Sequence, residues 1–194
     1  SSSWTGYRPS TLKPAWEPIV CFKKPFEGTY VNNVLTNGSG ALNIEGSRVG
    51  DEELPEAKAG QSTIGTFIRH DMVTPARTGR FPTNLMLDEE SAIMVGDNAR
   101  FFYASKSSSK ERKAGIGDMK NDHPTLKPVS LTHYIAKLLL PPASVGVRRI
   151  MVPFSGSGSE IIGCLLAWWD EVVGIELEAP YNEIAKRRCD HALA

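Results

Sequence analysis

The chain has 194 residues, of which 41% are hydrophobic and 23% are charged, which is the composition of an ordinary globular domain. Its 22 basic and 22 acidic residues balance and so exclude a global electrostatic attraction to nucleic acid; any such binding needs a local patch. Three cysteines without a CxxC pair and apolar runs too short to span a bilayer argue against a disulfide framework, a metal site and a membrane partner, and we expect a cytoplasmic protein.

The chain up to about residue 120 is predicted to be rich in loops. Residues 17–22 are its first strand candidate, and residues 31–60 are rich in glycine, asparagine and acids, which favours loops with minor structure. Residues 106–115 are basic and rich in serine, which is typical of a mobile loop. Two further strand candidates and one turn are predicted at residues 64–68, 101–104 and 79–84, respectively.

From Pro128 onward the pattern changes to alternating helices and strands. Apolar residues at helical spacing predict an amphipathic helix that ends at Pro141 and Pro142. After it come an apolar run at 147–152, a glycine turn, an apolar helix at 159–169, a second apolar run at 172–175 and a last helix at 180–188. The order strand, helix, strand predicts two parallel strands with the helix on one face of the sheet.

A glycine-bearing turn connects the first of these strands to its helix. The turn runs through Phe154, Ser155, Gly156, Ser157 and Gly158. Glu176 ends the next strand, 18 residues after Gly158. Glycines let the backbone approach a ligand, and an acid in this place can accept hydrogen bonds from both hydroxyls of a ribose. The unit therefore predicts a site for a nucleoside-bearing cofactor at the carboxyl edge of a parallel sheet.

Three segments, residues 123–128, 153–158 and 174–178, resemble in order and spacing the S-adenosylmethionine half of the amino-methyltransferases that modify adenine N6 or cytosine N4 in DNA. Within that family the resemblance is to the group whose cofactor motifs lie at the C-terminus. Other segments look like parts of bacterial and phage restriction–modification methylases, and these are residues 12–19, 40–44, 79–84, 103–106 and 111–112.

The resemblance implies an α/β fold, as part of a Rossmann-like sheet of an S-adenosylmethionine-dependent methyltransferase with a loop-rich N-terminal recognition region. Residues 1–30 would be a strand region of the catalytic-half sheet. Residues 31–120 would be the loop-rich DNA-recognition region, and residues 121–194 would be the βαβ half that binds S-adenosyl-L-methionine.

The resemblance also implies which residues bind the cofactor. Backbone N–H groups of the loop would face the methionine carboxylate, and Glu176 would hold the ribose hydroxyls. The segment before the amphipathic helix would flank the methionine end, where Thr125 and Lys127 offer a hydroxyl and a cation. The full implied set is His123, Thr125, Lys127, Phe154, Ser155, Gly156, Ser157, Gly158 and Glu176.

Double-stranded DNA is the implied macromolecular partner. Basic side chains that could contact its phosphates are Arg48, Arg80, Lys106, Lys110, Arg112 and Lys113. Such contacts would supply affinity that depends on salt and not on sequence. A solvated loop is an equally good interpretation of the basic segment.

The family's catalytic motif is missing from the sequence. That motif is Asp, Ser or Asn, then Pro-Pro, then an aromatic residue whose ring stacks on the flipped target base. The one Pro-Pro of this chain, Pro141-Pro142, lies between Leu140 and Ala143. We therefore expect the C-terminal part or a subunit of a site-specific DNA methyltransferase, with adenine N6 as the favoured target, that is inactive alone. Its catalytic strand would come from an N-terminal half or a partner chain, or the sheet would close in a homodimer.

Two other functions stay open at this point. Val152 stands where the family usually has an aspartate, and Glu160 places a carboxylate near the expected position of the cofactor's own carboxylate. Glu160 could compete with the ligand, and Val152 together with the absent catalytic motif suits a non-catalytic, DNA-binding or subunit-type relative. A dinucleotide-dependent oxidoreductase is the weaker alternative, because the loop reads G-x-G-x-x-x-x-G rather than G-x-G-x-x-G and the segment at residues 123–128 has no role in it.

Overall fold

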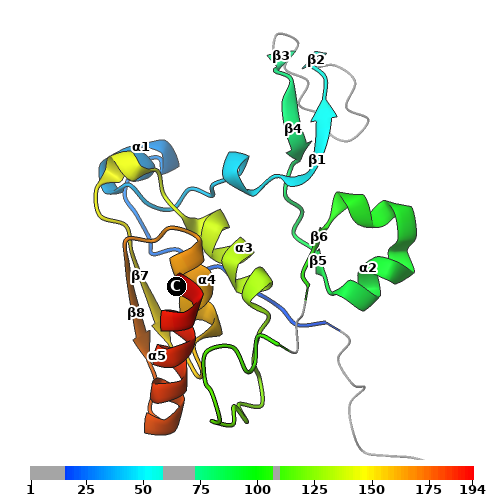
Figure 1. Ribbon diagram of the computed structural model, residues 1–194. Helices are drawn as coiled ribbons and strands as arrows, with labels where there is room; N and C mark the ends of the chain where they lie inside the picture. Colours follow the sequence, from blue (N-terminus) through cyan, green and yellow to red (C-terminus); the bar gives the residue numbers. More distant parts are fainter. Residues whose placement is uncertain (1–15, 59–72, 107–109) are drawn as a thin grey trace, which may run out of the picture.

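The computed structural model describes residues 16–58, 73–106 and 110–194 (Figure 1). Its C-terminal part is a single α/β unit. In chain order the unit consists of α3 (Val129–Leu139), the 3-10 helix η4 (Ala143–Val145), β7 (Arg149–Pro153), α4 (Ser159–Leu166), β8 (Glu171–Ile175) and α5 (Ala179–Leu193). These elements agree with the predicted alternation after Pro128, and α5 continues to Leu193, beyond its predicted end.

The strands β7 and β8 pair in parallel, as predicted, with Arg149 opposite Glu171. Arg149 Nε lies 2.6 Å from Glu171 Oε2. Just before the strands, Arg148 donates from Nε and Nη2 to the carboxylate of Asp170, with both distances 2.8 Å. Exposed ion pairs contribute little to stability. A slip of one residue would separate both pairs and turn the apolar side chains to the other face, so the pairs help to specify the register.

One face of the β7–β8 pair is covered by α3 and α4. The contacts there join Ile150, Val152 and Val172 of the strands to Ala136 of α3, to Cys164 of α4 and to Ala167, which caps the end of α4. The next helix, α5, packs against α4 and buries Ile184 and Ala185. This packing fixes the loop between β7 and α4, which lies at the carboxyl end of both strands.

The other face of the pair is left uncovered by the described part of the chain. Met151, Val173 and Ile175 point to it and are 62%, 56% and 51% exposed. Parallel sheets are normally covered on both faces. Throughout residues 16–58, 73–106 and 110–194 each sheet has two strands, so the described chain is a mixed α/β structure that does not display a larger Rossmann-like sheet.

The preceding part of the chain forms smaller elements. They are α1 (Tyr30–Asn37), the 3-10 helix η2 (Glu45–Ser47), the antiparallel pairs β1 (Val49–Leu54) with β4 (Arg77–Arg80) and β2 (Ala57–Lys58) with β3 (Val73–Thr74), and the parallel pair β5 (Met86–Leu87) with β6 (Tyr103–Ala104). Between β5 and β6 lie α2 (Glu89–Val95) and the 3-10 helix η3 (Gly96–Phe101). Figure 1 shows the β1–β4 ribbon projecting away from the α/β unit.

Helix α3 is where this earlier part attaches to the α/β unit. The rings of Tyr103 and Tyr134 stack with centroids 3.8 Å apart. Tyr103 donates its hydroxyl to the Ser130 carbonyl at 2.7 Å, and Tyr134 donates to the Ser47 carbonyl at 3.2 Å. The two tyrosines therefore join β6 and η2 to the same helix that covers the sheet.

Two predictions for the first part of the chain are wrong. Residues 17–22 lie in no helix or strand, because a strand exists only with a partner and none of the described residues pairs with them. Residues 31–60 contain α1 and β1 instead of loops. The start of α1 is capped by Thr29, whose hydroxyl accepts from the Asn32 N–H at 3.2 Å, and its end by Gly38 with φ 61°.

Of the two further strand candidates, one is shorter than predicted and the other is not described by the structure. The strand predicted at 101–104 is reduced to Tyr103–Ala104, because Phe101 belongs to η3. The strand candidate at 64–68 lies outside the described residues. None of the helices in the described ranges is long and apolar enough to cross a bilayer.

Candidate functional site

The loop that joins β7 to α4 is a tight turn at the carboxyl edge of the parallel pair. The Ser155 N–H donates to the carbonyl of Ile175 at 2.8 Å, which anchors the loop to the end of β8. The Gly158 N–H donates to the Ser155 carbonyl at 2.9 Å and closes the turn. Phe154 has φ 58° and a 92% exposed side chain. A non-glycine residue in the left-handed region costs free energy, and such residues cluster at ligand sites.

Gly156 sits at the centre of this loop, where a side chain does not fit. Its φ is 51°, and a Cβ atom added there would lie 2.5 Å from His123 Nε2. The backbone of the loop can therefore come close to the imidazole ring. The segment at residues 123–128 thus folds back over the glycine loop, which brings together two of the predicted parts.

Glu176 bridges the loop and the start of the last helix. Its Oε2 accepts the Gly156 N–H at 2.8 Å, and its Oε1 accepts the Glu178 N–H at 3.0 Å. The N–H donors of Glu178 and Gly156 hold the pKa of this carboxyl below its usual value, and the charge of His123 acts in the same direction. The carboxylate is therefore ionised at neutral pH and keeps lone pairs to accept further hydrogen bonds.

His123 is held between the loop and the last helix. Its ring meets that of Tyr181 edge to face, with centroids 4.8 Å apart and an interplanar angle of 73°. Its Nδ1 is buried and has no hydrogen-bond partner among the residues that the structure describes. An unpaired buried nitrogen carries a desolvation cost, so this atom is available to a ligand or a water molecule.

The other two residues predicted in this segment lie further out. Thr125 is in an exposed turn. The ammonium of Lys127 forms an ion pair with Glu17 at 2.5 Å and is 34% exposed. A cofactor carboxylate would therefore have to compete with Glu17 for this cation.

The serines of the loop face inward. Ser155 and Ser157 are each 2% exposed, and Ser159, which opens α4, is 1% exposed. Gly156 and Gly158 are also buried, whereas Phe154 is exposed. The hydroxyls of Ser157 and Ser159 accept hydrogen bonds from Arg188, so these side chains belong to the support of the loop and do not face a ligand.

Sequence reasoning missed two residues that provide this support. Arg188 and Asn121 are 2% and 5% exposed, and both donate to the loop. Arg188 is the last residue of the helix predicted at residues 180–188, where a basic side chain is ordinarily exposed. The helical spacing gave a usable signal, because Arg188 lies four residues after Ile184 and therefore on the same buried face of α5.

The six predicted DNA-contacting residues divide into two groups. The three arginines are engaged within the chain: Arg48 with Glu45 at 2.6 Å, Arg80 with Glu52 and with the Phe101 ring at 4.6 Å, and Arg112 with the carbonyls of Asn121 and His123, each at 3.1 Å. Lys106, Lys110 and Lys113 are exposed. The side chains of all three lysines are thus accessible at the surface, and the arginines hold parts of the chain together.

A cavity of about 1140 Å³ lies away from this loop. It is lined by α1, by residues 38–45, by the end of α3 and by residues 147–149, where β7 begins. Ligands of open α/β sheets bind outside the carboxyl ends of the strands. We therefore place the candidate cofactor site at the loop and not in this cavity.

No protein-family model matches the chain, and no curated protein matches it either. In the part of the chain that the structure describes, no group of three or more His, Cys, Asp or Glu is arranged to hold a metal ion. The function must therefore be argued from the loop, the acid and the segment that covers them.

Proposed function

We propose that the chain is the cofactor-binding and DNA-contacting part of an S-adenosyl-L-methionine-dependent DNA amino-methyltransferase, with adenine N6 as the favoured target. The observation that carries this proposal is the link between Glu176 and the Gly156 N–H, 2.8 Å long, at the carboxyl edge of the β7–β8 pair. An ionised acid beside a glycine turn suits a ribose and an adjoining anionic group.

The residues at the loop fit such a cofactor. A Cβ at Gly156 would collide with His123, so the backbone alone lines that side of the loop. The first N–H groups of α4 have no partner within the helix and suit a carboxylate. Glu176 would accept from the ribose, and His123 and Tyr181 would flank the bound molecule. When bound, the cofactor supplies the activated methyl group.

The position of His123 also favours this reading over a dinucleotide-dependent oxidoreductase. In the oxidoreductase pattern, residues 123–128 have no role, yet His123 lies directly over Gly156 and against Tyr181. A thermal-shift panel separates the two classes, because a ligand that binds the folded state raises the melting temperature. We expect shifts with S-adenosylmethionine and S-adenosylhomocysteine and none with NAD or NADP; a shift with the nicotinamides alone would overturn the assignment.

The chemistry on the target base is proposed to need another polypeptide segment. The sequence lacks the Asp/Ser/Asn-Pro-Pro-aromatic motif, and Met151, Val173 and Ile175 leave one face of the β7–β8 pair uncovered. An N-terminal half or a partner chain would cover this face and add the catalytic strand beside β7, and a homodimer is the alternative. We place such an assembly in the cytoplasm of a bacterium or a phage-infected cell, in a restriction–modification setting.

The pure chain is expected to transfer no methyl group to DNA. The reason is that no aromatic side chain of the missing motif is available to hold a flipped base. The measurement is transfer of label from S-adenosylmethionine to double-stranded DNA, with and without a polypeptide that carries the motif. Label in DNA with the chain alone would contradict the proposal.

A non-catalytic relative is the second candidate, and Val152 favours it. Val152 packs against the α3–α4 core, so its side chain supports the sheet and offers no carboxylate to the site. Such a protein would bind DNA but would bind S-adenosylmethionine at millimolar concentration or not at all. The affinity for the cofactor therefore separates the two candidates.

DNA binding is expected to depend on the three exposed lysines, Lys106, Lys110 and Lys113. Replacing all three with glutamine should flatten the slope of log affinity against log salt by about 2 to 3, because each lost phosphate contact removes about 0.9. The measurement is fluorescence anisotropy with duplex DNA at several salt concentrations. Lys186→Gln, on the exposed side of α5, is the matched control and should leave the slope unchanged. An unchanged slope in the triple variant would show that these lysines do not touch DNA.

A further inference from the structure

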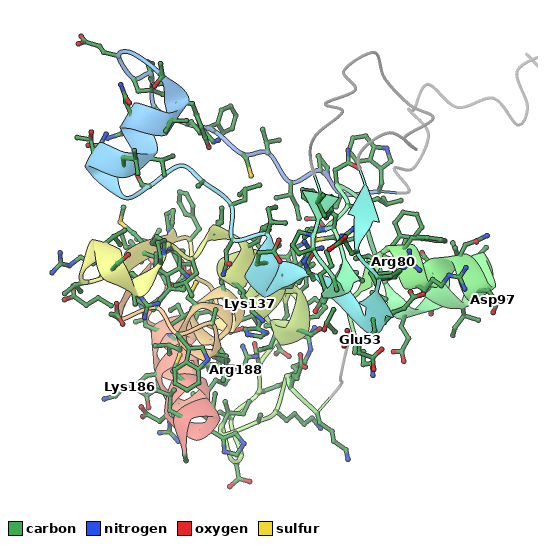
Figure 2. The ribbon with its side chains drawn as sticks, turned by 90° about the horizontal axis from the view of Figure 1, so that it is seen from above. Glu53, Arg80, Asp97, Lys137, Lys186 and Arg188 are labelled. Atoms are coloured by element: carbon green, nitrogen blue, oxygen red, sulfur yellow. The ribbon has the colours of Figure 1, made fainter. Side chains whose placement is uncertain are left out.

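A buried guanidinium lies beneath the glycine loop. Arg188 of α5 donates from Nη1 to the Ser157 carbonyl at 2.5 Å and to the Ser157 hydroxyl at 3.3 Å. Both Nη1 and Nη2 also lie 3.3 Å from the Ser159 hydroxyl. Figure 2 shows Arg188 on the side of α5 that faces the rest of the molecule, while Lys186 points away from it. One side chain therefore forms hydrogen bonds to both the turn and the first residue of α4.

Burying a guanidinium lowers the stability of the folded chain unless hydrogen bonds compensate for the lost hydration. Burial lowers the pKa of Arg188 from its usual value, and the carboxylates of Glu111 and Glu160 counteract this effect. An arginine nevertheless stays protonated in proteins. Within residues 16–58, 73–106 and 110–194 its Nε has no hydrogen-bond partner, so the guanidinium is directed at the loop while one of its own donors stays unpaired. An apolar residue would fill this place without those costs.

The loop is held from a second side as well. Asn121 donates its side-chain amide to the Ser157 hydroxyl at 3.2 Å, and the same amide donates to the Arg112 carbonyl at 3.2 Å. From α3, Thr132 donates to the Ser159 carbonyl at 2.9 Å. Ser157 is thus fixed between the segment that precedes α3 and the last helix.

The hydrogen bond from Arg188 to the Ser157 carbonyl determines where the backbone groups of the loop point. A peptide unit is planar and trans, so its carbonyl and its N–H point in opposite directions. When Arg188 draws the Ser157 carbonyl inward, the Gly158 N–H is turned the other way, where it donates to Ser155 and closes the turn. The free N–H groups at the start of α4 keep their direction only while this turn is closed.

We propose that Arg188, assisted by Asn121, is a positioning residue that holds the loop in its binding conformation and thereby sets the affinity for the amino-acid end of the cofactor. This inference rests on the proposed function. Arg188 does not touch the cofactor and acts through Ser157 and Ser159. Lysine cannot replace it fully, because one ammonium cannot span the carbonyl and both hydroxyls as the planar fork does.

The first test uses ligands with and without the amino-acid end. S-adenosylhomocysteine has that end, and 5′-methylthioadenosine lacks it. Arg188→Met should weaken binding of S-adenosylhomocysteine at least about tenfold, the loss expected for charge-assisted hydrogen bonds, while methylthioadenosine changes less than about twofold. Arg188→Lys should recover part of the loss. Equal weakening of both ligands, or of neither, would overturn the inference.

Milder variants keep the test valid if Arg188→Met does not fold. Ser157→Ala and Asn121→Ala remove one partner each and should show the same split between the two ligands, to a smaller extent. Lys186→Met is the matched control, because it lies on the exposed side of the same helix and should change neither affinity.

The second test needs no ligand and separates this inference from the proposed function. Amide hydrogen exchange of residues 156–159 should become at least about tenfold faster in Arg188→Met, while the β7 amides of Ile150 and Val152 stay protected. Unchanged exchange in the loop would refute the positioning role even if the cofactor binds. If the loop loosens as expected but the wild-type chain binds no S-adenosylhomocysteine, the proposed function fails, and with it the role of Arg188 in cofactor affinity.

Discussion

Gly163→Ala is expected to lower the free energy of unfolding by about 3 kcal/mol, toward the upper end of the range for overpacking a core. A Cβ at Gly163 would lie 2.4 Å from Thr132 Oγ1 and 2.6 Å from the backbone nitrogen of His133. At this glycine α4 lies directly against the backbone of α3, and a backbone atom cannot rotate away. The two helices would have to move apart, and this would loosen their packing on the β7–β8 sheet.

Urea unfolding of the purified variant measures this effect through the midpoint. Lys186→Ala on α5 is the control, and we expect a change within about 0.5 kcal/mol there because the side chain is exposed. In an unconstrained helix the change from glycine to alanine stabilises by about 1 kcal/mol. A more stable Gly163→Ala variant would therefore show that α3 and α4 do not pack as described.

Glu176→Gln is expected to weaken S-adenosylmethionine binding about a hundredfold. The carboxylate accepts from Gly156 and Glu178 with different oxygens, whereas an amide has only one acceptor and must turn an NH₂ group toward one of these donors. The variant thus loses charge-assisted bonds to the ribose and also disturbs the loop. Calorimetric titration measures the affinity. Glu183→Gln is the matched control, because Glu183 pairs with Arg187 on the exposed side of α5.

The same carboxylate predicts an acid limit for binding. Its folded-state pKa is held below the ordinary value of 4.5 by its N–H donors, so its contribution is fully present above that value and is lost as the pH falls through the lower folded-state pKa. Wild-type affinity should therefore be flat above pH 4.5 with respect to this group and should fall in stronger acid. An affinity that rises on acidification would contradict an ionised Glu176 in the site.

Local patterns explain what the sequence predicted correctly. The apolar runs of β7 and β8, the glycines between them and Glu176 lie close together in the chain, and short-range spacing determines their structure. The parallel pairing followed from the order strand, helix, strand. The meeting of His123 with Gly156 was suggested by the family resemblance and not by any local signal.

Long-range contacts explain what the sequence did not reveal. Residues 17–22 have the composition of a strand, but composition cannot supply a partner strand. Arginine is usually found at the surface, yet the fold places Arg188 beneath the loop, with its Nη1 2.5 Å from the Ser157 carbonyl oxygen. Arg48, Arg80 and Arg112 also bind groups of the chain itself, and in Arg80 and Arg112 these groups lie far from the arginine in the sequence or in a neighbouring loop, which local spacing does not reveal.

The DNA-recognition role of the earlier part of the chain remains a proposal. Figure 2 shows Glu53 and Arg80 on the ribbon of β1 and β4, and Asp97 beyond them on η3, away from the α/β unit.

Calorimetric titration of the wild-type chain with S-adenosylmethionine tests the central claim most directly. We predict one site per chain with a dissociation constant in the micromolar range, equivalent to about −8 kcal/mol. No measurable heat up to millimolar ligand, with a well-folded chain that still binds duplex DNA, would contradict a cofactor site at Glu176 and the glycine loop, and would favour the non-catalytic relative.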